Sequence, residues 1–221
     1  MDWLKAIVLA ALALGVLVAV GGSAQATTLC EENVNPCPLE QRYPVNETIL
    51  AGKTGGGAMG YVATTMGITR FSGECQETSI SWSTTENRGV GAVLFGNVSA
   101  MLYGKCKNGG ISPCEKVTAE NLPYNAELVP TVGGNGNAPL VNGKAGVRKL
   151  KFEKCGPTLV NCTYEPGEIP LVLKGGSPAT ISVVWSIKSE GGNPSCGEKI
   201  EMVGGYTVAA PKTPIWVESS P

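Results

Sequence analysis

Eight cysteines are the residues of this chain whose type and spacing are best suited to chemistry. A thiolate can attack an electrophile, bind a metal ion or join a second cysteine in a disulfide. A zinc site is not indicated, because the chain has no C-x-x-C pair and no histidine. Cys106 lies between Lys105 and Lys107, which would favour a reactive thiolate if this cysteine were free. The compartment in which the protein folds therefore decides which chemistry the cysteines support.

The N-terminus indicates that compartment. Lys5 precedes an apolar run over residues 6–20, and residues 24–26 read Ala-Gln-Ala. This layout predicts a signal peptide over residues 1–26, an apolar helix that is removed on export. The alternative is an uncleaved membrane anchor, although the apolar run is shorter than the ~20 residues that a spanning helix needs. We therefore expect a secreted or cell-surface protein with oxidised cysteines, in contact with a membrane only if the leader is uncleaved.

The spacing of the cysteines predicts how they pair. Three pairs each bracket a short stretch that contains glycine or proline, namely Cys30–Cys37, Cys106–Cys114 and Cys155–Cys162. The remaining pair, Cys75–Cys196, would join distant strands. The alternative is a bond from Cys75 to Cys106, which would reshuffle the others.

The acidic and basic side chains limit catalysis. Asp2, in the leader, is the only aspartate, and the other seventeen of the 18 acidic residues are glutamates. Without histidine or aspartate, a mature chain cannot build a Ser-His-Asp or Cys-His site, an aspartic dyad or an Asp-built calcium loop. We expect no catalytic residues, no metal ligands and no enzyme activity. The alternative is a hydrolase that acts on glycans with two glutamates.

Aromatic side chains could stack on sugar rings, as in a carbohydrate-binding module. Trp82 and Trp185 share the parity of their apolar neighbours, which predicts that both face the core. Trp216 lies near the C-terminus and is the candidate ligand contact. It could equally close the last strand.

A nucleotide site is not expected. Gly55, Gly57 and Gly60 match the G-x-G-x-x-G fingerprint, but the residues that follow Gly60 favour a strand rather than the required helix. We interpret this motif as a turn and expect no cofactor. A net charge of −1 offers no basic surface for nucleic acid.

The rest of the chain predicts short strands separated by turns. Ile181, Val183, Trp185 and Ile187 alternate with more polar residues, and three other runs, at residues 79–83, 149–153 and 200–208, show a similar two-residue period. Thirty glycines and 15 prolines supply the turns. We expect an all-β fold, an antiparallel β-sandwich or open barrel stapled by disulfides. The predicted organisation is the signal peptide, an irregular disulfide-bearing segment over residues 27–44, and a β-sandwich domain over residues 45–221.

Several short motifs resemble a group of exported, cysteine-paired β proteins from soil actinobacteria. These motifs are Arg42-Tyr43-Pro44, Glu120-Asn121-Leu122-Pro123-Tyr124, Asn161-Cys162-Thr163-Tyr164 and Pro178-Ala179-Thr180. The resemblance implies a bacterial surface or secreted location. That group has no established activity, so the resemblance implies no function.

We therefore expect an exported, non-catalytic structural or interaction protein whose partner is an extracellular protein or a glycan. The first alternative is a carbohydrate-binding module that uses exposed aromatics, and the second is the glutamate-dependent hydrolase. An exposed edge strand would favour protein–protein assembly.

Overall fold

The computed structural model describes residues 26–53, 59–86, 93–107, 109–143, 145–189 and 193–220. The predicted leader lies outside these residues, except for Ala26. The elements are β1 (Ala26–Cys30), η1 (Leu39–Gln41), β2 (Thr48–Lys53), β3 (Met59–Thr65), β4 (Ile68–Cys75), β5 (Glu77–Thr84), β6 (Leu94–Gly104), β7 (Lys116–Glu120), β8 (Tyr124–Thr131), β9 (Asn135–Asn137), β10 (Leu140–Val141), β11 (Lys149–Cys155), β12 (Val160–Tyr164), β13 (Leu171–Lys174), β14 (Thr180–Lys188), η2 (Pro194–Cys196), β15 (Lys199–Ala210) and β16 (Trp216–Ser220). No helix among the described residues is long and apolar enough to cross a lipid bilayer.

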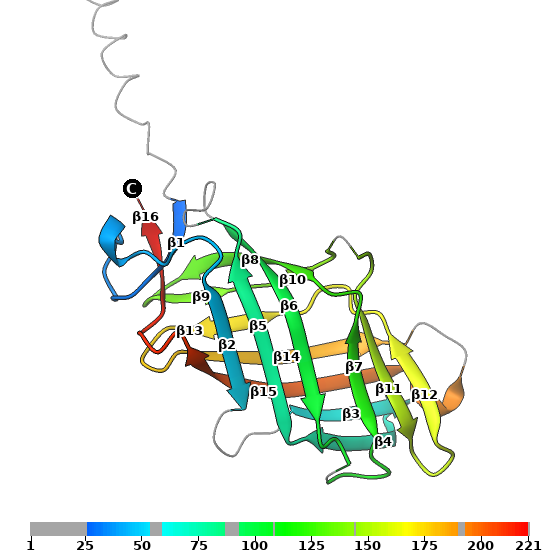
Figure 1. Cartoon of the computed structure of the whole chain (residues 1–221). Helices are drawn as coiled ribbons and strands as arrows, with labels where there is room; N and C mark the ends of the chain where they lie inside the picture. Colours follow the sequence, from blue (N-terminus) through cyan, green and yellow to red (C-terminus); the bar gives the residue numbers. More distant parts are fainter. Residues whose placement is uncertain are drawn as a thin grey trace, which may run out of the picture.

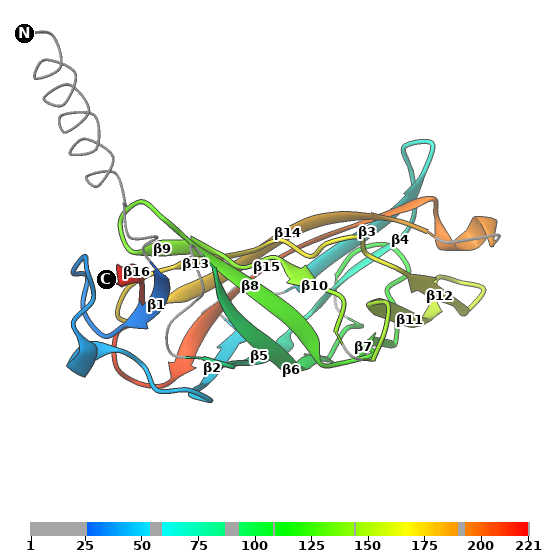
Figure 2. The same ribbon diagram turned by 90° about the horizontal axis from the view of Figure 1, so that it is seen from above.

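Most strands belong to one large antiparallel sheet. Its order is β14-β13-β9-β8-β6-β5-β2-β15-β3-β4, with β10 paired to β8. β14 also pairs with β15, so the sheet closes on itself. In Figure 1, strands β2, β5 and β6 cross β13, β14 and β15 at a steep angle, and Figure 2 shows the two layers one above the other. The predicted all-β, antiparallel sandwich-like or barrel-like fold is confirmed.

The two-residue period of the sequence explains which side chains fill the core. On β14, Ile181, Val183, Trp185 and Ile187 are buried, whereas Val184 between them is exposed. Trp82 on β5 is also buried, so the inward orientation predicted for Trp82 and Trp185 is confirmed. Alternate burial is expected where one sheet face packs on the core and the other meets solvent.

Two smaller sheets complete the molecule at opposite ends (Figure 1). A three-stranded sheet has the order β12-β11-β7, and β1 pairs with β16. The segment over residues 27–44 therefore contains most of β1, followed by η1. The register places Cys30 opposite Trp216 and Thr28 opposite Glu218.

The disulfides require a correction to the predicted pairing. The structure joins Cys30 to Cys37, the pair expected from their spacing. The predicted pairs Cys106–Cys114, Cys155–Cys162 and Cys75–Cys196 are wrong. The bonds present instead are Cys75–Cys106, Cys114–Cys155 and Cys162–Cys196.

Strand register is the physical reason for two of these bonds. Glu77 lies opposite Gly104 in the β5–β6 pair, so continuing that register by two residues brings Cys75 opposite Cys106. Lys116 lies opposite Glu153 in the β7–β11 pair, and the same extension brings Cys114 opposite Cys155. Residues opposite one another on antiparallel strands are only about 5 Å apart, which suits a disulfide.

The predicted Cys155–Cys162 bond fails for a related reason. Although β11 and β12 are neighbours, Cys155 lies opposite Val160, and Cys162 lies opposite Phe152. The two cysteines are therefore offset along the ladder, and Cys162 bonds to Cys196 of η2 instead. That bond ties the three-stranded sheet to the connection between β14 and β15.

Candidate functional site

The site begins where strands β6 and β7 run side by side without forming a ladder. Residues 94–98 of β6 pair with β8, but residues 99–104 pair only with β5 among the described residues. β7 likewise pairs only with β11. We call the space between residues 99–104 of β6 and residues 116–120 of β7 the β6–β7 groove. Both backbones present an open strand edge to it.

Local sequence explains why the ladder stops. The β5–β6 register shifts between Ser81 and Trp82, so that Ser99 is a bulged residue on β6. A bulge bends its strand and increases the local twist. On the opposite side, Asn121 has a φ of 64°, and Pro123 has no N–H to donate. These features separate β7 from β8 and let β7 join β11 instead of β6.

The β6–β7 groove is hollow. Its volume is about 640 Å³. The described residues that line it are Gln76, Glu77, Thr78, Ser79, Met101, Leu102, Tyr103, Gly104, Lys116, Val117 and Thr118. Leu102 is 62% exposed, although it is a large apolar side chain. The buried hydroxyl oxygen of Thr118 has no hydrogen-bond partner. The groove therefore combines apolar surface with unpaired polar groups, as sites for extended peptides do.

Tyr61 of β3 holds the two sides of the groove at a set separation. Its hydroxyl donates to the carbonyl of Cys106, just after β6, over 3.0 Å. The same oxygen accepts the backbone N–H of Cys114, just before β7, over 2.8 Å. Each of these cysteines is also fixed by a disulfide, to Cys75 and Cys155 respectively. The groove is therefore braced by bonds that do not depend on a ladder between β6 and β7.

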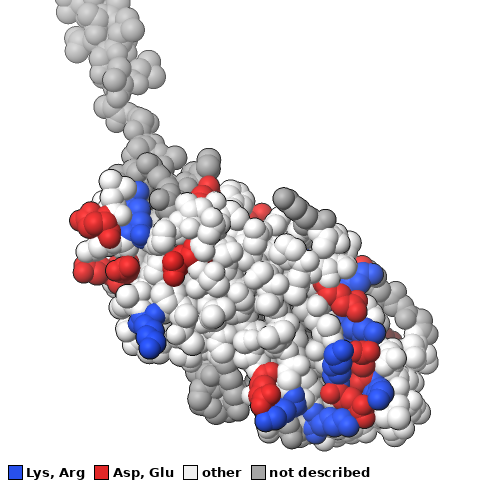
Figure 3. All heavy atoms as spheres, in the orientation of Figure 1, with Lys and Arg blue, Asp and Glu red and all other residues white. Residues whose placement is uncertain are grey.

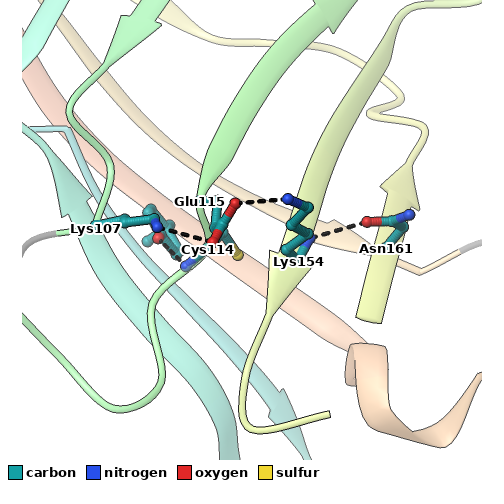
Figure 4. Close-up of polar contacts among 6 residues, drawn as sticks. Lys107, Cys114, Glu115, Lys154 and Asn161 are labelled. Atoms are coloured by element: carbon teal, nitrogen blue, oxygen red, sulfur yellow. Dashed lines mark hydrogen bonds and ion pairs between the residues drawn. The ribbon is translucent and has the colours of Figure 1, made fainter. Parts of the chain in front are cut away.

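Lysines and glutamates gather beside Cys106 and Cys114, at the end of the groove that Tyr61 braces. Glu115 is bonded to Lys107 at 2.8 Å and to Lys154 at 2.9 Å (Figure 4). These two lysines lower the pKa of the Glu115 carboxyl. Figure 3 shows that charges gather at this end of the visible face, whereas the middle of that face carries few.

Two further glutamates form separate ion pairs. The Glu153 carboxylate forms ion pairs with Lys151 at 3.0 Å and with Lys116 at 3.6 Å, and both contacts lower the pKa of this carboxyl. Glu77 pairs with Lys105. Five lysines thus share three glutamates in these ion pairs.

Trp216, the predicted ligand contact, is the first residue of β16, and the figures show β16 with β1 at the end of the molecule away from β7 (Figures 1 and 2). The indole is partly buried over Gly134 and Gly175, because a Cβ atom at either glycine would come within 2.5 Å of its Cε3. Glu218, two residues further, is 5% exposed, and its Oε1 has no hydrogen-bond partner. Burial raises the pKa of this carboxyl.

The structure also shows where the glycine motif and the candidate metal-binding and acidic side chains lie. Gly60 lies in β3, so a strand rather than a helix follows the G-x-G-x-x-G motif, whose first four residues, 55–58, lie outside the described residues. Among the described residues, no group of three or more Cys, His, Asp or Glu side chains could hold a metal ion. Glu77 is the only carboxylate among the described residues that line the groove.

The sequence pointed to Trp216 but not to the groove. Tyr61 and Leu102 carry no motif, and their roles depend on pairings between residues far apart in the chain. No protein-family model matches this chain, and no curated protein or solved structure matches it either.

Proposed function

We propose that this chain is an exported, non-catalytic interaction protein that binds an extended segment of another protein in the β6–β7 groove. The observation that carries the proposal is the pair of open strand edges that flank this groove. An added strand would satisfy backbone N–H and C=O groups on one of these edges, which is the basis of strand addition. β7 has five residues, so about five residues of a partner would form ladder bonds.

Bracing of the groove supports the same proposal. Tyr61 and two disulfides hold residues 106 and 114 in place whether or not a partner is present. A site that is already ordered loses less conformational freedom on binding, so more of the contact energy contributes to affinity.

The export part of the proposal rests on the leader-like N-terminus and on the four disulfides. Disulfides persist mainly in oxidising compartments, outside the cytosol. No cysteine among the described residues is left free.

The test combines capture with amide hydrogen exchange. The protein comprising residues 27–221 is used to capture partners from the envelope and culture medium of its own cells. Each captured protein is then tested for protection of amides in residues 99–104 and 116–120. Leu102→Arg should weaken binding about tenfold or more, because it places a charge on the apolar lip of the groove.

Val184→Arg is the matched control, since Val184 is 65% exposed on the opposite layer and Leu102 is 62% exposed. The proposal is supported by a partner that protects the amides of the groove and whose binding is lost with Leu102→Arg but not with Val184→Arg. Partners that protect other regions contradict it. If the free protein self-associates with the groove protected, the occupant is a second copy and the proposal is wrong.

Glycan binding at Trp216 is the second candidate function. The observation in its favour is that part of the indole remains at the surface, over a floor of glycine backbone. Flat aromatic surfaces of this kind stack on sugar rings. Retention on insoluble polysaccharides that is abolished by Trp216→Ala, but not by Leu102→Arg, would favour this function over the groove.

A further inference from the structure

We infer that a second pocket, formed by β4, the β11–β12 hairpin and η2, binds a small carboxylate with an apolar body. We call this space the Arg70 pocket. Its volume is about 190 Å³, and none of its described lining residues lines the β6–β7 groove. Figure 1 shows β4, β12 and the connection that contains η2 at the same end of the molecule. Among the residues that line the pocket are Arg70, Phe71, Pro157, Thr158, Val160 and Ser195.

Arg70 is the extra residue of a β-bulge on β4. Ala63 of β3 lies opposite Phe71, and the next residue, Thr64, lies opposite Thr69, so Arg70 has no partner on β3. In a regular strand successive side chains point to opposite faces, and a bulge changes this direction locally. The bulge therefore allows two successive residues, the exposed Arg70 and the buried Phe71, to line one pocket.

The guanidinium of Arg70 is available to a ligand. Arg70 is the only charged residue among the described lining residues, and it forms no ion pair with a described carboxylate. A guanidinium presents parallel N–H donors that match the two oxygens of a carboxylate. The pocket therefore favours a carboxylate over an uncharged polar group.

Charged residues on the neighbouring elements do not occupy Arg70. Glu74, further along β4, lines a different pocket. Glu153 and Lys154, which precede the turn of the β11–β12 hairpin, are each in an ion pair with another residue. Glu198 follows η2, and its backbone N–H bonds to a carbonyl of β3, but this residue does not line the pocket.

The other lining residues supply the apolar surface and the size limit. Phe71, Pro157 and Val160 are apolar, whereas Thr158 and Ser195 carry hydroxyl groups. Pockets for drug-sized ligands measure about 300 Å³ or more, so a pocket of about 190 Å³ holds a more compact molecule. An acid of the size of benzoate would place its carboxylate at Arg70 and its body against the apolar residues.

Disulfides hold the walls of the Arg70 pocket together. Cys155, at the end of β11, is bonded to Cys114. Cys162 of β12 is bonded to Cys196 of η2, the residue that follows Ser195. A pocket whose walls are already fixed loses little conformational freedom when a ligand binds.

Benzoate and benzamide test the inference, because they have nearly the same shape and differ in charge. Each is titrated into the ¹⁵N-labelled protein comprising residues 27–221, and the backbone amide shifts are followed by NMR. We expect benzoate to shift the amides of residues 69–71, 158–160 and 195–196, with a dissociation constant of about 1 mM. Benzamide should bind about tenfold more weakly or less, since it lacks the charge-assisted bonds to Arg70.

Two variants locate the binding site. Arg70→Gln should weaken benzoate binding about tenfold or more while the rest of the spectrum stays unchanged, because Arg70 is exposed. Lys174→Gln is the matched control and should leave binding unchanged. It removes one positive charge from another exposed residue, which lies on β13 next to Gly175, where Trp216 packs.

The C-terminal residue of a polypeptide offers the same chemistry as a free acid. N-acetylvaline and 3-methylbutanoate distinguish these sources, because both carry a carboxylate and an isopropyl group and only the first has a peptide-like amide. Tighter binding of N-acetylvaline assigns the pocket to a chain terminus, and tighter binding of 3-methylbutanoate assigns it to a free acid.

The inference is overturned if benzoate and benzamide bind with equal affinity, or if Arg70→Gln binds benzoate as the wild type does. It is also overturned if about 20 mM benzoate shifts none of these amides, or shifts only amides elsewhere. These results leave the proposed function untouched, since the β6–β7 groove is followed through residues 99–104 and 116–120.

Discussion

The backbone N–H of Cys114 donates a hydrogen bond to the phenolic oxygen of Tyr61 over 2.8 Å. The same hydroxyl donates to the carbonyl of Cys106, so one side chain from β3 connects the residues that follow β6 and precede β7. The ring of Tyr61 packs edge-on against Phe152 of β11, with centroids 5.3 Å apart. The width of the β6–β7 groove is thus set by a residue that belongs to neither of its strands.

Tyr61→Phe should destabilise the protein by about 1–3 kcal/mol, because it leaves buried backbone groups of Cys106 and Cys114 without their partner. The free energy of unfolding, measured in urea, checks the magnitude. Hydrogen exchange at the amide of Cys114 should accelerate in the same variant. Unchanged stability with unchanged exchange would contradict the bracing role of the hydroxyl.

Gly73→Ala should disturb the same brace. A Cβ atom at Gly73 would lie 2.6 Å from the Tyr61 hydroxyl oxygen and 2.8 Å from Cβ of Pro113, so the tyrosine or the loop must move. We expect a loss of roughly 1–3 kcal/mol in unfolding free energy. Gly60→Ala on β3 is the matched control, since its new Cβ atom would make only an ordinary contact of 3.8 Å with the carbonyl oxygen of Val203. Equal effects of the two substitutions would exclude a special role for Gly73.

The disulfides should differ in their contribution to stability. Cys114 and Cys155 are 41 residues apart, whereas Cys30 and Cys37 are 7 apart. From loop entropy alone, replacing the first pair with alanine should cost about 4 kcal/mol and the second about 2 kcal/mol. Urea unfolding of the two double variants measures this difference.

Peptide mapping without reduction should recover the bonds Cys75–Cys106 and Cys162–Cys196, and a Cys106–Cys114 peptide would contradict the structure.

Glu218 should make stability depend on pH. Burial raises the pKa of its carboxyl above the value in the unfolded chain, so the folded state favours the neutral acid. The contribution of protonated Glu218 to the free energy of unfolding is therefore fully present below the pKa of the unfolded chain. It is lost as the pH rises through the raised pKa of the folded protein. A glutamine at position 218 does not titrate, so the thermal midpoint of Glu218→Gln should rise relative to that of the wild type as the pH increases above about 4. A difference that is independent of pH would rule out ionisation of Glu218 as the cause.

Local pattern was sufficient to predict the strands and their buried faces. On β14, alternation alone placed Trp185 in the core together with Ile181 and Val183. The same local reasoning failed for Cys106 and Cys114, because eight residues of separation suggested a stapled loop. In the structure Cys106 follows β6 and Cys114 precedes β7, and these two strands pair with different partners.

The candidate groove could not have been predicted from the sequence. It exists because Ser99 bulges from β6 and because β7 pairs with β11 rather than with β6. The pairing of β7 with β11 joins residues about 30 positions apart in the chain. No window of neighbouring residues carries that information.

Composition and periodicity alone determined that this chain forms antiparallel strands around an apolar core, since a side chain's parity decides which face of a sheet it occupies. They also determined that the chain has no histidine and no aspartate after Asp2, and therefore lacks groups on which many catalytic sites depend. Tertiary structure decided which strands pair, and therefore which cysteines meet and where two strand edges stay open. Register between distant segments depends on the packing of the whole core, and local residue types do not encode it.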